Sequence, residues 1–272
     1  MNIAIIIARG GSKRLPRKNI KLFCGHPLVA WAITQARFSY TIDEVYVSTD
    51  DDEIAEISSN YGAKIIRRPD WPDADQVAAN RVFCHALKVL KEKYGDKFTS
   101  ATMILPTNPL IKPGELDNGF NEFKRLGRER ILPLIPLRET VVYKKVNTNL
   151  SRLIMFEKGY KNLGEGPLWS IANPNWYLTS FDEYPDHDEF LNDIENAPLL
   201  EISFIEAEYW QYADVDVEEE FKFAEVIMEH YILKGNGMNI YEDYYNAVKG
   251  NDMQKELDLS KYIGNIRQFG GD

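Results

Sequence analysis

The sequence predicts an α/β protein in which a mostly parallel β-sheet is covered by helices on both faces. Apolar runs of strand length alternate along the chain with amphipathic stretches of helical length, and this alternation is typical of a buried parallel sheet. The first run, Ile3 to Ile7, leads at once into a loop that carries two glycines and several cations. Strands of α/β proteins present backbone N–H groups and positive charge to phosphates in this way.

The first strand is expected at residues 2–8, where apolar residues follow one another. A helix is expected at 27–37, because apolar residues recur at helical spacing and a proline stands near the start. A second strand at 44–48 precedes a helix at 51–60, which has acidic residues in its first turn, where the helix dipole favours them. A glycine ends this helix, and a short strand is expected at 63–66.

The later elements continue the alternation of buried runs and amphipathic stretches. The last of the expected helices opens with three glutamates, again in the turn that the dipole favours. Helices are expected at residues 77–94, 113–126 and 217–232, and strands at residues 101–105, 130–135 and 200–205.

Two segments depart from this pattern. Residues 138–198 mix charged, aromatic and glycine residues without long periodicity, which predicts either an irregular surface insertion or a region with a role in binding and assembly. The polar and aromatic residues 236–272 predict a C-terminal extension with one or two short helices docked on the main body. The main domain is therefore expected to span residues 1–235, with the insertion inside it.

Composition limits the classes of function. A formal net charge of -10 over 272 residues argues against general nucleic-acid binding. The two cysteines, Cys24 and Cys84, give no disulfide framework and fit a reducing compartment. The sequence opens directly on a strand, without a signal-peptide pattern, and no apolar run approaches the roughly 20 residues that span a bilayer. We expect a soluble, cytoplasmic protein without membrane contact.

The basic loop, residues 9–19, carries the strongest chemical signal. Its glycines let the backbone approach a ligand closely, and its cations can neutralise phosphate charge. It fits neither the P-loop motif nor the dinucleotide motif, and the density of cations favours a triphosphate. The alternative is a solvated basic turn. The loop contains Arg9, Gly10, Gly11, Ser12, Lys13, Arg14, Arg17, Lys18 and Asn19.

Five motifs, in this order, resemble those of the acylneuraminate cytidylyltransferases, enzymes that activate sialic acids and related sugar acids. The first is R-G-G-S-K-x-x-P-x-K-N in the basic loop. The others are V-S-T-D at residues 47–50, R-R-P at 67–69, L-P-T-N-P-L at 105–110 and D-V-D at 214–216. The resemblance covers residues 1–130 well and 200–232 moderately.

The resemblance implies a three-layer, Rossmann-like fold of the nucleotide-diphospho-sugar transferase type. It also implies Mg2+-dependent transfer of CMP from CTP to a sugar acid, with release of pyrophosphate. Arg9, Lys13 and Lys18 would then lie near the triphosphate, Asn19 and the backbone of Ala8 near the nucleotide, and Arg68 near the cytidine end. The remaining loop residues, Gly10, Gly11 and Ser12, are expected to line the nucleotide. Arg14 and Arg17 occupy variable positions of the family and are left out of the expected site.

Asp214 and Asp216 are the candidate metal ligands, and Asp216 is also a candidate catalytic residue. Alternation along an extended segment puts both side chains on one face, where two carboxylates can share Mg2+ with phosphate oxygens. The alternative is that Asp216 caps the following helix.

Asp50 and Asp51 follow a strand end, where open α/β sheets bind ligands, but Asp51 is better explained as the start of a helix.

The acceptor half departs from the family. Leu105 replaces a glutamine that helps to read the nucleotide, and Ile111 and Ile171 stand where arginines are usual. A non-sialic acceptor, such as a phosphonate or phosphosugar, is therefore an alternative. Two further alternatives are a nucleotide-sugar-dependent glycosyltransferase, against which the late position of the D-V-D motif counts, and a nucleotide-binding regulator whose acceptor pocket has decayed.

The insertion at 138–198 is too long for an idle loop and is rich in the aromatic residues that are enriched at interfaces. We expect a homodimer in which this region covers the partner's acceptor pocket. The aromatic residues considered are Tyr143, Phe156, Tyr160, Trp169, Trp176 and Tyr177, and the candidate carboxylate-binding cations are Arg138, Lys144, Lys145 and Arg152.

Overall fold

The computed structural model describes residues 1–69, 71, 77–127, 130–136, 141–147, 150–156, 169–170, 176–181 and 203–250. Its centre is an eight-stranded sheet in the order β10-β7-β11-β6-β1-β4-β5, with β12 paired to β7. Four parallel strands form its N-terminal half: β1 (Asn2–Ile7), β4 (Glu44–Thr49), β5 (Lys64–Arg67) and β6 (Ser100–Ile104). The expected α/β class with a mostly parallel sheet is confirmed.

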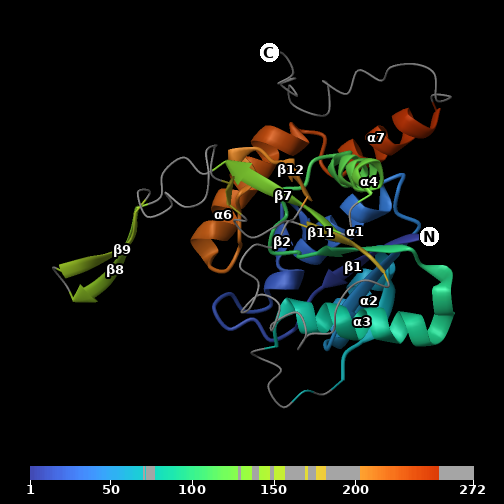
Figure 1. Ribbon diagram of the computed structural model, residues 1–272, viewed down its shortest axis with the longest axis horizontal. Helices are drawn as coiled ribbons and strands as arrows, with labels where there is room; N and C mark the ends of the chain where they lie inside the picture. Colours follow the sequence, from blue (N-terminus) through green and yellow to red (C-terminus); the bar gives the residue numbers. More distant parts are fainter. Residues whose placement is uncertain are drawn as a thin grey trace.

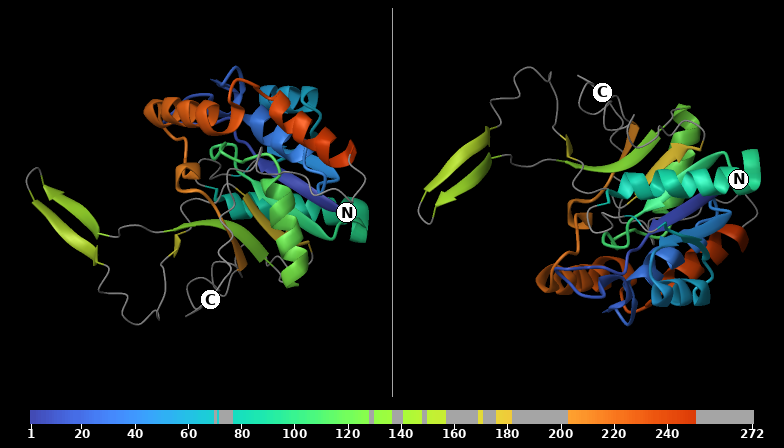
Figure 2. Two further views of the ribbon diagram at one scale, coloured as in Figure 1. Left: turned by 90° about the horizontal axis from the view of Figure 1, so that it is seen from above. Right: turned by 90° about the horizontal axis from the view of Figure 1, so that it is seen from below.

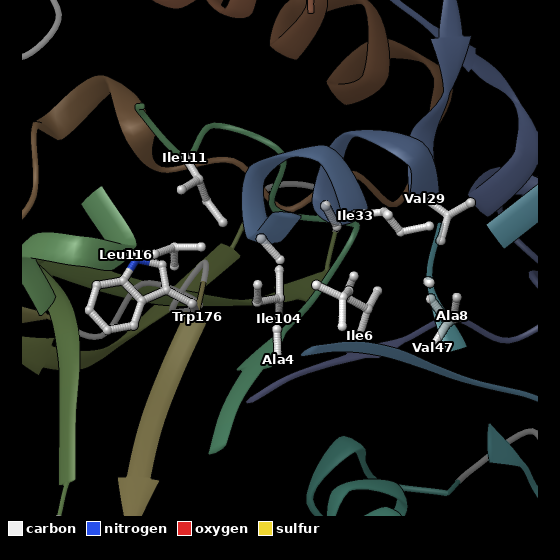
Figure 3. Close-up of a cluster of buried hydrophobic side chains, with 14 of the residues drawn as sticks. Ala4, Ile6, Ala8, Val29, Ile33, Val47, Ile104, Ile111, Leu116 and Trp176 are labelled. Atoms are coloured by element: carbon white, nitrogen blue, oxygen red, sulfur yellow. The ribbon is translucent and has the colours of Figure 1, made fainter. Parts of the chain in front are cut away.

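Alternation along β1 divides the core into two layers, and helices lie on both sides of the sheet (Figure 1). Ala4 and Ile6 face α1 (Leu28–Arg37), α2 (Asp52–Asn60) and α4 (Glu115–Leu126). Ile3 and Ile5 face α3 (Ala79–Tyr94) on the opposite side of the sheet. Helices therefore cover both faces, as the uninterrupted apolar run of this strand predicts. Figure 3 shows the first layer, in which Val29 and Ile33 of α1 meet Ile6 and Val47.

The C-terminal helices pack on the outer side of α1 (Figure 2). Trp31 of α1 lies in one buried cluster with Phe221 of α6 (Glu218–Ile227) and Tyr241 of α7 (Asn239–Gly250). Tyr241 is completely enclosed, and its Oη donates to the carbonyl of Ile111 over 2.6 Å. α7 lies within the segment expected to be a C-terminal extension, and residues 251–272 lie outside the described part of the chain.

Several strands lie within residues 138–198, for which an irregular surface insertion was one of the two alternatives. β8 (Val141–Asn147) and β9 (Leu150–Phe156) form an antiparallel hairpin set apart from the main body (Figure 2). β11 (Trp176–Ser180) enters the central sheet antiparallel to both β6 and β7 (Arg130–Pro136). The two-residue β10 (Trp169–Ser170) also pairs with β7, and β12 (Ser203–Glu206) runs parallel to it.

Trp176 belongs to the core and is wrongly expected at an interface. Its side chain is buried beside Gly119 of α4, and its Nε1 donates to Glu115 Oε1 over 2.9 Å. Gln211 donates to the other carboxylate oxygen over 2.6 Å. Trp176 was not expected in the core because β11 has only five residues, too few for the period-two pattern of a strand to stand out in the sequence.

Other boundaries differ by one to three residues, the usual uncertainty of helix ends. The late helix stops at Ile227 and continues as the π-helical turn η5 (Met228–Leu233). No helix in the described part of the chain combines the length and apolar character that crossing a bilayer requires. The short elements are η1 (Lys18–Ile20), β2 (Leu22–Phe23), β3 (His26–Pro27), η2 (Gly95–Lys97) and η4 (Tyr209–Gln211).

Candidate active site

A cavity of about 440 Å³ opens beyond the carboxyl ends of β1 and β6. In open α/β sheets ligands bind at this edge. One wall comes from the basic loop and another from the start of α3, and Asp216 closes a third side. The residues that line it are Ile7, Arg9, Ser12, Lys13, Arg14, Leu15, Lys18, Asn19, Arg68, Val77, Ala79, Val82, Leu105, Thr107 and Asp216.

The start of the basic loop is held against the end of β4. The backbone N–H of Ala8 donates to the carbonyl of Ser48 over 3.1 Å, and that of Gly10 donates to Asp50 Oδ1 over 2.9 Å. A β-carbon at position 10 would lie 2.4 Å from Asp51 Oδ2. Glycine is therefore required at position 10 because the loop and the carboxylate approach so closely.

The contact between Lys18 and Asp216 connects the basic loop to the segment before α6. Lys18 Nζ donates to the carbonyl of Val215 over 2.6 Å and to Asp216 Oδ1 over 2.7 Å, and the lysine is only 7% exposed. Arg14 binds the other oxygen of the same carboxylate. The helix-cap alternative for Asp216 is not supported, because its carboxylate binds loop cations and α6 begins after Val217.

Asp214 lies beside this ion-pair group. The buried Val215 side chain and its N–H bond to the carbonyl of Thr107, 2.9 Å long, fix the segment between the two acids. Burial, and then the charge of Asp216, raise the pKa of Asp214, while Lys18 and a hydrogen bond with Thr107 oppose the shift. A cation bound beside Asp214 would oppose this rise in its pKa, because an opposite charge favours the ionised carboxylate.

The donor set fits Mg2+. Both side chains offer hard oxygen ligands, which this ion prefers. Among the described residues, no group of three or more His, Cys, Asp or Glu side chains could hold a metal ion. The protein would then supply at most two carboxylates, and Mg2+ commonly takes the rest of its ligands from substrate phosphates and water.

Arg68 supplies a half-buried cation to the lining of the cavity. Its Nη2 donates to the carbonyl of Ser48 over 2.8 Å. Burial, and to a lesser extent the charge of Arg9, lower the pKa of Arg68 to about 10, with Asp50 acting in the opposite direction. The guanidinium stays charged at neutral pH. The lining of the cavity also includes the apolar residues Val77, Ala79 and Val82.

Most of the expected site residues meet at the cavity. Arg9, Ser12, Lys13, Lys18, Asn19, Arg68 and Asp216 line it. Ala8, Gly10, Gly11 and Asp214 do not, and the N–H groups of Ala8 and Gly10 already donate to the β4 side. Asn19 Nδ2 donates to the carbonyl of Arg9 over 2.9 Å, so this side chain also braces the loop.

Sequence reasoning missed Arg14 and Thr107, which both line the cavity. The position of Arg14 between two expected phosphate-binding lysines is the signal that could have identified it. Arg17, which was also left out, does not line the cavity and pairs with Asp51 and Glu53. Asp51 starts α2 as expected, accepting from the N–H of Ile54 over 2.9 Å.

The candidate carboxylate-binding cations cannot be placed: Arg138 and the side chains of Lys144, Lys145 and Arg152 lie outside the described part of the chain.

Comparisons with known proteins agree with this geometry. A family model described as "Cytidylyltransferase" matches residues 3–151. Pseudaminic acid cytidylyltransferase of Campylobacter jejuni subsp. jejuni serotype O:2 is 37% identical over 124 residues, covering 45% of this chain and 53% of the relative. CMP-N,N'-diacetyllegionaminic acid synthase of Legionella pneumophila is 27% identical over 234 residues, covering 84% and 96%. The matched part thus spans about half of the Campylobacter relative and nearly all of the Legionella one.

Solved structures confirm the fold. CMP:2-keto-3-deoxy-manno-octonic acid synthetase, solved in complex with CTP, aligns with a TM-score of 0.62 at 16% identity, covering 85% of this chain and 99% of the other. 4-Diphosphocytidyl-2C-methyl-D-erythritol synthase of Anaerococcus prevotii aligns with a TM-score of 0.56 at 14% identity, covering 84% and 98%.

Proposed function

The chain belongs to the cytidylyltransferase family, and from this premise we propose that it transfers CMP from CTP to a sugar acid. The acceptor hydroxyl attacks the α-phosphorus, the bond to the β-phosphate oxygen breaks, and pyrophosphate leaves. The observation that supports this most directly is the cavity itself, which Arg9, Lys13, Lys18 and Arg68 all line.

The residues act mainly by positioning and by stabilising charge, which supply most of the rate enhancement in phosphoryl-type transfers. Lys18 is held by Val215 and Asp216, so its ammonium is oriented before the nucleotide arrives. Arg9 and Lys13 extend the positive surface along the triphosphate. Arg68 and the apolar wall at Val77 receive the cytidine end.

Asp214 and Asp216 would hold Mg2+, which when bound would neutralise charge on the triphosphate. Asp216 would then serve both the ion and Lys18, and Arg14, whose side chain is 69% exposed, would leave Asp216 to reach the phosphates. We assign the reaction to the cytoplasm, where CTP is available.

The acceptor class follows from the relatives, whose names specify pseudaminic and legionaminic acids. A homodimer remains part of the proposal, because the β8–β9 hairpin stands away from the main body in a position to reach another subunit (Figure 2). The candidate carboxylate-binding cations are Arg138, Lys144, Lys145 and Arg152. The loss of arginines at Ile111 and Ile171 keeps a phosphonate or phosphosugar acceptor as the second candidate.

The test is release of pyrophosphate from CTP with a panel of sugar acids, phosphonates and phosphosugars, with UTP, ATP and GTP as nucleotide controls. We expect release with CTP and a sugar acid only, together with a CMP-sugar of the corresponding mass. Release with a phosphonate or phosphosugar alone would select the second candidate. No CMP adduct with any acceptor in the panel would contradict the proposal.

A further inference from the structure

Arg17 and Lys18 are adjacent in sequence, but their side chains make contacts on opposite sides of the basic loop. Lys18 points inward, to Val215 and Asp216. Arg17 points outward, where its guanidinium reaches both oxygens of Asp51, at 2.5 and 3.2 Å, and also Glu53. The backbone turn between the two residues therefore determines where the buried ammonium group of Lys18 lies.

That turn requires an unfavourable backbone conformation. Arg17 has φ 56° and ψ 27°, the left-handed region, which residues with a β-carbon generally avoid. Its carbonyl accepts from the N–H of Ile20 over 3.0 Å and from that of Lys21 over 3.1 Å, which begins the short helix η1. Such a conformation persists at a functional site when the surrounding contacts over-determine it.

The contacts that hold Arg17 come from a rigid element. Asp51 is the N-cap of α2, whose Ile54, Ala55 and Ser58 are buried. A guanidinium that meets both oxygens of a fixed carboxylate has a defined orientation as well as a defined position. In agreement with this, the hydrogen bond from Arg17 is the largest cause of the lowered pKa of Asp51.

We propose that Arg17, clamped by Asp51 and Glu53, is a positioning residue that holds the left-handed turn and thereby aims Lys18 at Asp216. This inference rests on the proposed function for the consequence to the reaction, but its geometry can be tested independently. It links the N-terminus of α2, which lines no part of the cavity, to the buried cation in the site.

The structure provides a matched control. Arg67 also pairs with an acid in the first turn of α2, Asp52, over 2.7 Å, but the two side chains are 53% and 96% exposed. Exposed pairs of this kind contribute little, and Arg67 ends the extended strand β5 rather than occupying a left-handed turn. Arg17→Met and Arg67→Met therefore remove the same charge from the same end of the same helix.

The first experiment is a double-mutant cycle between Arg17→Met and Lys18→Ala. Because a small misplacement of a catalytic group can cost up to about 100-fold, we expect Arg17→Met to lower kcat about tenfold and to change KM for CTP less than about twofold. Residues that act as a unit are non-additive, so the double variant should match Lys18→Ala alone. A further tenfold loss in the double variant overturns the proposal.

The second experiment needs no catalysis. Lys18 is buried, whereas the side chain of Lys21 is 37% exposed, so acylation by a lysine-directed reagent, measured by mass spectrometry, should label Lys21 first. Arg17→Met should raise labelling of Lys18 several-fold relative to Lys21, and Arg67→Met should not. Unchanged labelling in Arg17→Met overturns the proposal.

The two experiments separate the possible failures. A wild type that shows the expected labelling but releases no pyrophosphate with any acceptor contradicts the proposed function and leaves the positioning role intact. If Arg17→Met does not fold, Asp51→Asn replaces it, because an asparagine can still cap α2 but loses the charge that holds Arg17. The same labelling increase and non-additivity are then required.

Discussion

Lys18 Nζ and Asp216 Oδ1 lie 2.7 Å apart although the two residues are separated by 198 positions in the chain. The contact joins the basic loop to the segment before α6. Neither half of the site is complete alone, because the loop carries cations without carboxylate ligands, and the D-V-D segment carries acids without phosphate-binding groups. The most informative variants therefore alter this pair.

Lys18→Ala should lower turnover by two or more orders of magnitude, since it removes a preoriented charge that is worth roughly 100- to 1,000-fold in such sites. The measurement is the rate of pyrophosphate release at saturating CTP. Lys21→Ala is the control, because Lys21 pairs with Glu218 outside the cavity. Wild-type turnover in Lys18→Ala would exclude this lysine from the mechanism.

Asp216→Asn should abolish Mg2+-dependent turnover and retain much of the CTP binding, because the loop cations remain in place. Calorimetric titration with CTP, with and without Mg2+, separates the two effects. The control is Asp52→Asn, whose side chain is 96% exposed on α2. A metal dependence unchanged from wild type would remove Asp216 from the proposed ligand set.

Arg68→Ala should reduce kcat/KM for CTP by roughly 100-fold, as expected for loss of a charge-assisted contact in a desolvated site. Arg67→Ala should change it by no more than about threefold, because surface ion pairs contribute little. The two arginines are neighbours in sequence, but only Arg68 lines the cavity. Equal losses in both variants would contradict the assignment.

Gly119→Ala should destabilise the fold by about 1–3 kcal/mol, the usual cost of overpacking a core. A β-carbon at this position would lie 2.2 Å from the Trp176 ring, so the ring or the helix must move. Thermal unfolding measures the change. Asn118→Ala, one position earlier on an exposed part of α4, should stay within about 0.5 kcal/mol of wild type. A similarly small effect of Gly119→Ala would contradict the close contact between position 119 and the Trp176 ring.

Glu44 should stabilise the protein at neutral pH and lose this effect in acid. Burial raises the pKa of Glu44, but hydrogen bonds from Tyr46, Lys64 and Lys97 outweigh it and lower the pKa to about 2. Since the unfolded value is about 4.3, the contribution is present above that pH and disappears as the pH falls toward 2. Glu44→Gln should therefore be less stable than wild type at pH 7, with a difference that shrinks below about pH 4.

Chemical denaturation across this pH range provides the measurement for Glu44→Gln. Glu56→Gln, on an exposed position of α2, is the control and should show no such convergence. A difference between wild type and Glu44→Gln that is constant from pH 7 to pH 3 would contradict the assignment.

The sequence predicted the elements that carry strong local patterns. β1 is a continuous apolar run, and α2 has acids in its first turn and a glycine after its end, so both were found nearly in place. The basic loop was recognised because glycines and cations stand together directly after a buried strand. Asp216 was selected because the D-V-D motif resembles that of the family, and alternation was expected to put it on one face with Asp214.

Features set by distant contacts could not be predicted in this way. β11 was missed because its five residues gain their place from pairing with β6 and β7, and the burial of Trp176 depends on space left by Gly119. Arg14 was omitted because it occupies a variable position of the family, and only the fold shows that Asp216 is within its reach. The bond from Gly10 to Asp50 likewise joins residues that no local pattern relates.

The place of β11 between β6 and β7 also bears on synthesis of the chain. β1, β4, β5 and β6 are complete by residue 104, whereas β11 begins at residue 176. At about 5–20 residues per second, the free edge of β6 stays open for several seconds, and open apolar edges invite pairing with other chains. The yield of native protein should therefore be limited by how quickly β11 pairs with the free edge of β6. Nascent chains that stall between residues 127 and 176 should be the ones that aggregate.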